Sequence, residues 1–269
     1  MLRELRTAFR ITRVGLHLGW GAATVAVVYP WLDDRWRRAL KRRWSRQLLE
    51  MLGVKLGAGD TAPPPGLIVC NHISWLDIFV INAITPAAFV AKAEVKDWPL
   101  IGWLCARTET LFLERGSRTS ARRTIEAMVA RLKRGIHVAV FPEGTTTAGE
   151  HVLPFHAALF QAAIEAQTQV VPLALRYADQ RGNPSRAAAY VGDVTLWQCL
   201  CAIARANGLV AELRVLHALE PHDGVRSELA RQCRTRILMH LEGRRFLPVL
   251  PEEAAAVGEV PELEVQPVP

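Results

Sequence analysis

Short apolar runs that alternate with helical patterns constrain the fold of this chain more than any other feature. Between residues 66 and 219 the apolar runs are GLIVC, AAFVA, TLFLE, HVAVF, QVVPLAL, AAAYVGDV and LVAELRVLHAL. Most are of strand length and rich in residues that favour buried strands. Helical patterns accompany them at 74–84, 120–135, 155–166 and 225–243. This alternation predicts an α/β fold with a mixed, largely parallel sheet flanked by helices.

The alternating region lies between two segments of different composition, which predicts three parts in the chain. Residues 53–250 carry the strand and helix patterns and are long enough for one α/β domain. Residues 1–52 combine an apolar run with a basic block and are predicted to be membrane-anchoring helices. Residues 251–269 hold five glutamates, four prolines and no cation, so we expect an acidic, disordered tail.

An uncharged run of 19 residues extends from Val14 to Leu32. As one α-helix it would rise about 28 Å, close to the ~30 Å hydrocarbon core of a bilayer. Gly15 and Gly19 form a small-xxx-small pair that allows a second helix to approach closely. A cleaved signal peptide fits poorly, because no small-residue cleavage site precedes the arginines that follow. We expect this run to insert into a membrane; a buried core helix is the alternative.

The next segment is predicted to be a basic amphipathic helix. Apolar residues recur at every fourth position and share one helical face: Trp36, Leu40, Trp44 and Leu48. The other faces carry cations: Arg37, Arg38, Lys41, Arg42 and Arg43. Such a helix typically lies on anionic headgroups, with its tryptophans at the interface. The larger cation excess after the apolar run favours the cytoplasmic face of an inner membrane.

The positive charge of the chain is confined to this N-terminal part. Residues 1–46 hold 11 Lys or Arg against 3 acids, whereas the remainder holds 22 against 23. Such a block suits an anionic surface, which is either a membrane or a nucleic acid. A nucleic-acid arm explains the arginines but neither the tryptophans nor the apolar run. We therefore expect membrane lipids as a partner and no nucleic acid.

The stretch CNHISWLDIFV, residues 70–80, places His72 and Asp77 at the junction of a strand and a helix. Two helical residues at this spacing lie about 140° apart and meet poorly. If the helix begins near Ser74, however, His72 lies in the turn and can fold back onto Asp77. The carboxylate then accepts the Nδ1–H of the imidazole and leaves Nε2 free as a base. The alternative is a capping box, in which Ser74 and Asp77 only start the helix.

Other strand ends carry residues suited to binding an anion. Arg115 and Gly116 follow TLFLE, the turn FPEGTTT follows HVAV, and a proline lies inside VVPLAL. Ligands gather where the strands of an α/β sheet end. These ends together supply a base, a cation and a Gly-Thr turn whose amides can bind an oxyanion or a phosphate.

Four ordered blocks resemble those of the glycerolipid acyltransferase family, which includes the 1-acylglycerol-3-phosphate acyltransferases. The blocks are Asn71-His72 with Asp77, Phe112 with Arg115, FPEGT at 141–145, and Val171-Pro172. They cover about residues 67–177. The family resemblance also agrees with a membrane-associated N-terminus.

The resemblance implies transfer of a fatty acyl group from acyl-CoA or acyl-carrier protein to a lysolipid hydroxyl, with no resident cofactor. His72, oriented by Asp77, would take the proton of the hydroxyl as it attacks the thioester. Asn71 and Ser74 are expected to support the turn and the helix start.

The resemblance also implies where the substrates bind. Arg115 is expected at the anionic headgroup, and Glu143, Gly144 and Thr145 around the acceptor. Lys92, in FVAKAEV, is a second candidate cation. An ordinary solvated lysine at the end of a strand is the alternative for Lys92.

The sequence departs from the common family pattern near the expected headgroup site. Thr146 follows FPEGT where an arginine is frequent, His156 stands where a lysine is frequent, and Ala158 replaces a usual glycine. A dianionic phosphate ordinarily favours such cations. The FPEGTT form resembles the branch that acylates lyso-ornithine lipids, whose headgroup lacks a phosphate. We expect 1-acylglycerol-3-phosphate as the acceptor, which gives phosphatidate, with lyso-ornithine lipid as the alternative.

The remaining expectations concern metals and a non-catalytic role. The five cysteines are odd in number and have no zinc-binding spacing, so we expect reduced thiols and no structural metal. A lipid-binding module that keeps the fold without catalysis is the alternative to an enzyme. The His72 and Asp77 pair argues against that alternative.

Overall fold

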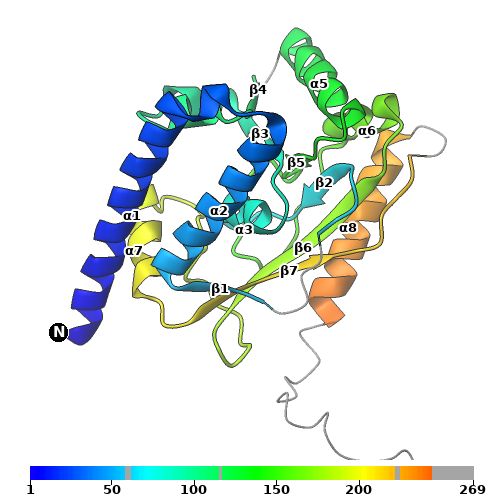
Figure 1. Ribbon diagram of the computed structural model, residues 1–269. Coiled ribbons are helices and arrows are strands. Elements are labelled where there is room, and N and C mark those ends of the chain that lie inside the picture. Colours follow the sequence, from blue (N-terminus) through cyan, green and yellow to red (C-terminus); the bar gives the residue numbers. More distant parts are fainter. Residues whose placement is uncertain (58–61, 115–116, 222–224, 244–269) are drawn as a thin grey trace, which may run out of the picture.

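The computed structural model describes residues 1–57, 62–114, 117–221 and 225–243. A central sheet crosses the body, and the N-terminal helices pack against one side of it (Figure 1). The expected tail at 251–269 and the candidate Arg115 lie outside the described residues.

The described residues form a seven-stranded sheet in the order β1-β7-β6-β2-β5-β3-β4. Its strands are β1 (Val54–Leu56), β2 (Leu67–Cys70), β3 (Ala88–Lys92), β4 (Leu111–Leu113), β5 (Val138–Val140), β6 (Val170–Ala178) and β7 (Leu209–Val215). The pairing of β6 with β7 is antiparallel and the other pairings are parallel. The prediction of a mixed, largely parallel sheet is confirmed. The carboxyl ends of β6, β2, β5, β3 and β4 therefore meet at one edge.

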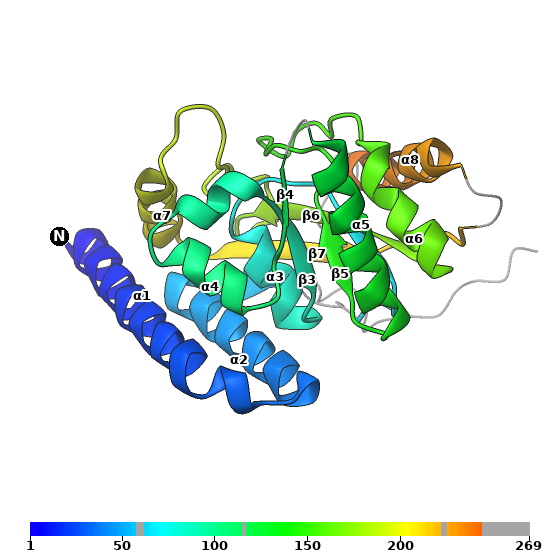
Figure 2. The same ribbon diagram turned by 90° about the horizontal axis from the view of Figure 1, so that it is seen from above.

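Helices cover both faces of the sheet (Figure 2). One side holds α1 (Leu2–Val27), α2 (Asp34–Leu52), α3 (Asp77–Ile84), α4 (Ile101–Arg107) and α7 (Leu196–Arg205). The other side holds α5 (Arg118–Lys133), α6 (Gln161–Ala166) and α8 (Arg226–Gly243). Short 3-10 turns complete the chain: η1 (Tyr29–Trp31), η2 (Ala93–Asp97) and η3 (Ala157–Phe160).

Strand β2 shows why its run is apolar without interruption. Leu67 and Val69 belong to the core beneath α5, α6 and α8, whereas Ile68 and Cys70 belong to the core beneath α2, α3 and α7. All four side chains are fully buried. Neighbouring strands and two helical layers thus exclude water from both faces, as is usual for parallel sheets.

The uncharged run at 14–32 does not form one continuous helix, and that expectation is wrong. Helix α1 begins among the arginines at Leu2 and ends at Val27. The η1 turn follows, with Pro30 at its start, where a proline cannot donate the backbone hydrogen bond that a longer α-helix needs. In the parts of the chain that the structure describes, no helix has the length and apolar character needed to cross a membrane.

The apolar stripe of α2 faces the protein, which corrects the expectation of interfacial tryptophans. Trp44 stacks on His17 of α1 with ring centroids 4.6 Å apart, and it meets Phe79 of α3 at 5.5 Å. Leu48 is buried in the core. Trp36, by contrast, is 62% exposed. The stripe therefore holds the α1–α2 hairpin against the body.

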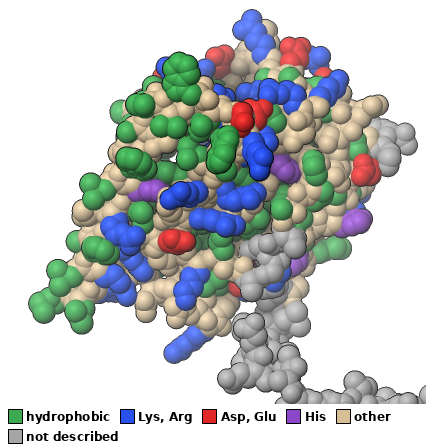
Figure 3. Space-filling view, in the orientation of Figure 1, with side chains coloured by type: hydrophobic (Ala, Val, Ile, Leu, Met, Phe, Trp, Pro, Cys, Tyr) green, Lys and Arg blue, Asp and Glu red, His purple; other side chains and the backbone are tan. Residues whose placement is uncertain are grey.

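The outer face of α1 presents apolar side chains to solvent. Its exposed apolar residues recur at intervals of three, four or seven: Leu2, Leu5, Phe9, Leu16, Trp20 and Val27. This spacing places them on one face of a helix. Figure 3 shows hydrophobic side chains along the side occupied by α1, and Lys and Arg side chains gathered over α2. The exposed apolar face belongs to α1, not to α2.

The segment AAAYVGDV, expected as a strand, joins no strand and instead crosses the turn after β2. The Tyr190 N–H donates to the Ile73 carbonyl at 3.0 Å, and the Thr146 hydroxyl donates to the Tyr190 carbonyl. Helix α7, which the sequence analysis missed, follows this segment with a capping box at Thr195. Strand β1 and helix α4 were also missed because each is shorter than the periodic patterns that reveal an element.

Candidate active site

The turn after β2 brings His72 and Asp77 together. The His72 Nδ1 atom lies 2.8 Å from an Asp77 carboxylate oxygen, Oδ2. The same oxygen accepts the backbone N–H groups of Ile73 at 2.7 Å and Ser74 at 2.9 Å. Helix α3 begins at Asp77, so His72 lies outside the helix and folds back over its first turn. The Asp77 carboxylate thus both starts the helix, as the capping alternative held, and bonds the imidazole.

The second oxygen of Asp77 binds a residue that sequence reasoning missed. The Tyr177 hydroxyl, on β6, donates to Asp77 Oδ1 at 2.8 Å. Burial, with the nearby Asp77 charge, raises the pKa of Tyr177 well above its usual range, so the hydroxyl keeps its proton and donates. A tyrosine inside the apolar run VVPLALRYA was the available signal, because a buried tyrosine hydroxyl normally has a partner.

The His72 ring is held on one side and open on another. Phe141, which follows β5, stacks on the imidazole with ring centroids 3.9 Å apart. The His72 side chain retains 19% of its accessible surface, while Asp77 is fully buried. Since a carboxylate at Nδ1 requires a proton on that nitrogen, Nε2 is the unprotonated nitrogen of the neutral ring. No described residue forms a hydrogen bond with Nε2.

Glu143 clamps the backbone of the same turn. One carboxylate oxygen accepts the His72 N–H at 2.7 Å, and the other accepts the Leu153 N–H at 2.8 Å. The side chain is only 4% exposed. Burial raises the pKa of Glu143, and its two backbone donors oppose that shift. The hydrogen bonds of Glu143 are with the backbone of His72 and Leu153, and its expected part in shaping the acceptor pocket stays a prediction.

Further bonds fix the backbone on either side of His72. The Asn71 side chain exchanges two hydrogen bonds with the backbone of Leu175, at 2.8 and 2.9 Å. The Thr147 N–H donates to the His72 carbonyl at 2.8 Å. Ser74 is buried, and its hydroxyl lies 4.0 Å from the sulfur of Cys199 on α7. Asn71 and Ser74 are therefore placed as structural supports.

The candidate binding residues are more dispersed than the His72 turn. Gly144 has φ +67°, in the left-handed region that favours glycine, and its N–H bonds the Phe141 carbonyl. Thr145 is exposed beside it. Lys92 is exposed at the carboxyl end of β3, and no described residue pairs with it. Because β3 and β5 are parallel neighbours, Lys92 shares the sheet edge of the turn. Arg115 lies outside the described residues.

Two cysteines lie close to the turn but are unsuited to act as nucleophiles. Cys70 directly precedes Asn71 and is fully buried. Burial raises the pKa of its thiol well above the usual range, and burial also raises the pKa of Cys199. Both thiols therefore stay protonated, and a thiol is a far weaker nucleophile than a thiolate.

Comparisons with known proteins show which protein family this chain resembles. A family model described as "Acyltransferase" matches residues 55–176. The lyso-ornithine lipid O-acyltransferase of Pseudomonas aeruginosa is 37% identical over 208 residues, which cover 77% of this chain and 80% of that protein. The 1-acyl-sn-glycerol-3-phosphate acyltransferase of Neisseria meningitidis is 42% identical over 167 residues, covering 61% and 65%.

A solved structure shows the same fold. It is the 1-acyl-sn-glycerophosphate acyltransferase of Thermotoga maritima, with a TM-score of 0.66 and 19% identity. The match covers 91% of this chain and 97% of the Thermotoga chain. At this identity the likeness concerns the fold alone, and it extends to the N-terminal helices as well as the sheet.

Proposed function

The chain belongs to the acyltransferase family, and from that premise we propose that it is a lysolipid O-acyltransferase. It would transfer a fatty acyl group from acyl-CoA or acyl-carrier protein to the hydroxyl of a lysolipid. The observation that carries this proposal is the 2.8 Å bond between His72 and Asp77, on a ring that remains accessible from one side. A non-catalytic lipid-binding module is set aside, because the family is one of enzymes.

In the proposed mechanism the lysolipid itself is the nucleophile. His72 Nε2 takes the hydroxyl proton as the alcohol oxygen attacks the thioester carbonyl. Asp77 holds the ring and stabilises the imidazolium that forms. When the tetrahedral intermediate collapses, the C–S bond breaks and the imidazolium returns the proton to the leaving thiolate. The products are an ester and a free thiol, and a positioned base of this kind contributes about 10²–10⁴-fold in rate.

The first candidate acceptor is 1-acylglycerol-3-phosphate, which would make the product a phosphatidate. Arg115 would hold the phosphate, with Lys92 as a second cation. Lys92 is the last residue of β3, and Arg115 comes two residues after β4 in the sequence; the carboxyl ends of both strands share the edge where His72 lies. The Gly144–Thr145 turn, of which Thr145 is exposed, would line the acceptor site, and Glu143 would shape that site by holding the backbone of His72.

A second candidate acceptor is lyso-ornithine lipid, and a specific observation favours it. Thr146 stands where the common pattern has an arginine, and its hydroxyl is engaged with the Tyr190 carbonyl instead of facing an anion. His156 likewise replaces a frequent lysine. The Pseudomonas relative, which bears the name lyso-ornithine lipid O-acyltransferase, is matched over four-fifths of its length.

We further propose that the protein works at a membrane surface, on the cytoplasmic face of an inner membrane. The exposed apolar face of α1 supports this placement, because contiguous exposed apolar surface marks a membrane or protein contact. Exposed arginines on the neighbouring α2, such as Arg42 and Arg43, suit anionic headgroups. Helix α1 would lie along the membrane–water interface, a location that tryptophans such as the exposed Trp20 favour.

The test is to offer labelled acyl-CoA, and separately acyl-carrier protein, with lysophosphatidate and lyso-ornithine lipid side by side. Acyl transfer to either lipid, seen as a labelled diacyl product, is the expected result. If neither lipid is acylated by either donor, the proposal fails.

Arg115→Ala then separates the two acceptors. The substitution should impair the phosphate acceptor more than the aminolipid if the guanidinium binds the phosphate. Equal losses on both acceptors would contradict that role.

A further inference from the structure

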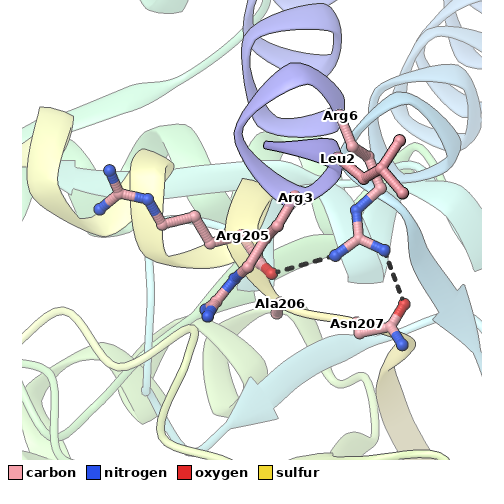
Figure 4. Close-up of a pocket in the computed structure, with 6 residues that line it drawn as sticks. All are labelled: Leu2, Arg3, Arg6, Arg205, Ala206 and Asn207. Atoms are coloured by element: carbon pink, nitrogen blue, oxygen red, sulfur yellow. Dashed lines mark hydrogen bonds between the residues drawn. The ribbon is translucent and has the colours of Figure 1, made fainter.

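A basic hollow lies at the N-terminal end of α1, away from the catalytic turn. It has a volume of about 540 Å³ and is lined by Leu2, Arg3, Arg6, Arg205, Ala206 and Asn207. Three of these six residues are arginines and none is acidic. Figure 4 shows that the arginines come from two helices, α1 and the end of α7.

Part of this basic cluster has a structural explanation. Arg10 donates to the carbonyls of Ala204 and Ala206, which are left free where α7 ends. Arg6 donates to the Asn207 side chain at 3.0 Å and to the Arg205 carbonyl at 3.5 Å (Figure 4). These bonds fix the Arg6 guanidinium in place, and its Nε is buried without a partner.

The same explanation does not extend to Arg3 and Arg205. Arg3 is exposed, and its guanidinium has no partner among the described residues. Arg205 has one long contact, 3.8 Å to Glu4, and both side chains are at least half exposed. The capping of α7 therefore does not account for Arg3 and Arg205, two residues at the hollow whose guanidinium groups have no acidic partner within hydrogen-bond distance in the described parts of the chain. Guanidinium groups without a close acidic partner are well suited to bind the oxygens of a phosphate group.

The surroundings of the hollow indicate the source of that phosphate. Leu2 lines it, and Leu5 and Phe9 continue the exposed apolar face along the same helix, each at least 62% exposed. If this face rests on a bilayer, as proposed above, the hollow opens at the level of the headgroups. We propose that it binds the phosphate of an anionic phospholipid headgroup, as a second lipid site apart from the acceptor site.

The position of α7 links this site to the catalytic turn without merging the two. Cys199, near the start of α7, contacts Ser74 in the turn. Arg205 is six residues further along the helix, about 9 Å by the helical rise. A headgroup held by Arg205 would anchor the far end of the helix that supports the turn. The proposal rests on membrane docking, so its test must measure docking separately.

The experiment compares vesicle binding by the full-length protein and two variants of equal charge. Arg3→Gln/Arg205→Gln removes two cations from the hollow, and Arg42→Gln/Arg43→Gln removes two exposed cations from α2. Partition is measured on phosphatidylcholine vesicles and on vesicles that also contain phosphatidylglycerol. Thermal unfolding of each variant checks that it is folded.

If the exposed apolar face of α1 is responsible for membrane docking, the three proteins should bind phosphatidylcholine vesicles equally well. On phosphatidylglycerol vesicles both variants should partition more weakly than the unmodified protein, because each has lost the long-range attraction of two cations. The partition of Arg3→Gln/Arg205→Gln, the hollow variant, should fall about tenfold further, because this variant also loses charge-assisted hydrogen bonds to the headgroup. Equal losses by the two variants would overturn the site while leaving docking intact. Failure of the unmodified protein to bind either vesicle would refute docking and the site with it.

Soluble competitors distinguish a lipid from a free phosphate source. Inorganic phosphate and coenzyme A are added at matched ionic strength during binding to phosphatidylglycerol vesicles. The proposal predicts that neither lowers the partition of the unmodified protein to the level of the hollow variant. If either does so, the hollow takes a soluble phosphate and the assignment to lipid is wrong.

Discussion

The turn after β2, which holds His72 and Asp77, and the α1–α2 hairpin both carry charged residues, but they use them in different ways. In the turn, the Asp77 carboxylate is fully buried and accepts four hydrogen bonds, from His72, Ile73, Ser74 and Tyr177. In the hairpin the cations divide into two groups. Some bond to the body, and others, such as Arg42 and Arg43, are exposed with no partner among the described residues.

The cations of α2 that bond to the body show that a basic block need not be entirely an interaction surface. Lys41 donates to the Glu109 carboxylate at 2.8 Å and to the Ala87 carbonyl at 3.3 Å. Arg46 donates to the Ala83 carbonyl at 2.8 Å. These bonds fasten α2 to the end of α3, to the segment after it and to the segment before β4. The difference teaches that local bonds bring His72 onto Asp77 within the turn, whereas the placement of the hairpin depends on contacts distant in sequence.

The largest expected effect is in the turn. Asp77→Asn preserves the size of the side chain but removes the charge that orients the imidazole. Because the imidazole would no longer be a positioned base, kcat should fall about 10²–10⁴-fold, as for loss of the base itself. Steady-state kinetics on the better acceptor measures this loss, and circular dichroism checks the fold. If Asp77→Asn retained near-normal turnover, the carboxylate would be a helix cap and no more.

The next effect tests the hairpin. Glu109→Gln leaves the Lys41 ammonium, which is 11% exposed, without its anionic partner. We expect a loss of about 2 to 3 kcal/mol in the free energy of unfolding, because an unpaired buried charge is costly. Denaturant unfolding at neutral pH measures the loss. Glu126→Gln is the control, since its partner Arg122 is 57% exposed and such pairs contribute about 0 to 1 kcal/mol.

The same variant makes a prediction about pH. Burial raises the pKa of Glu109, but the charge and hydrogen bond of Lys41, together with the Tyr29 hydroxyl and the Arg37 charge, outweigh it, and the net shift is downward from 4.5. A depressed carboxyl pKa stabilises the fold above the ordinary value, and this stabilisation is lost as the pH falls through the folded-state value. The stability gap between the unmodified protein and Glu109→Gln should therefore shrink below pH 4.5. A constant gap would contradict the ion pair as its cause.

Two tryptophans allow the outer and inner faces of the hairpin to be tested separately. Trp20 is 71% exposed on α1, whereas Trp44 stacks on His17. Trp20→Ala should lower vesicle partition about 10- to 150-fold, because the variant loses about 1.5 to 3 kcal/mol from burial of the aromatic side chain in lipid. Its unfolding free energy should be unchanged. Trp44→Ala should instead destabilise the protein by about 3 kcal/mol. The reverse pattern would mean that the faces are assigned wrongly.

The smallest expected effect concerns the positioning residue Tyr177. Tyr177→Phe removes one donor from Asp77 and leaves the imidazole bond intact, so kcat should fall severalfold while KM stays constant. Tyr190→Phe is a matched control, because its hydroxyl has no partner among the described residues. A change in KM alone, or equal effects in both variants, would indicate that Tyr177 does not act through Asp77.

The sequence predicted the sheet and the meeting of His72 with Asp77 because both depend on short spacings. Buried runs such as GLIVC identify strands, and a five-residue interval across a helix start limits where an imidazole can reach. The clamp by Glu143 lay beyond such reasoning, since its partner His72 is 71 residues away. Tyr177 was missed for the same reason, at 100 residues from Asp77.

The orientation of the N-terminal helices was also beyond local patterns. The periodicity of α2 showed that it has one apolar face, but not whether that face meets lipid or protein. Trp44 meets His17 and Phe79 because α1 and α3 flank it in the folded chain. On α1, arginines interrupt the apolar sequence, and exposure in the folded state was needed to recognise a continuous apolar face.

The central claim is that the His72 imidazole, held by Asp77, removes the proton from the acceptor hydroxyl. The most direct measurement is the initial rate of acyl transfer by His72→Ala at saturating donor and acceptor, beside its thermal stability and vesicle binding. We predict a rate about 10²–10⁴-fold lower. Vesicle binding should be unchanged and the fold should persist, because Asp77 keeps its bonds from Ile73, Ser74 and Tyr177. A folded, membrane-binding His72→Ala protein that transfers acyl groups at nearly the normal rate would contradict the account.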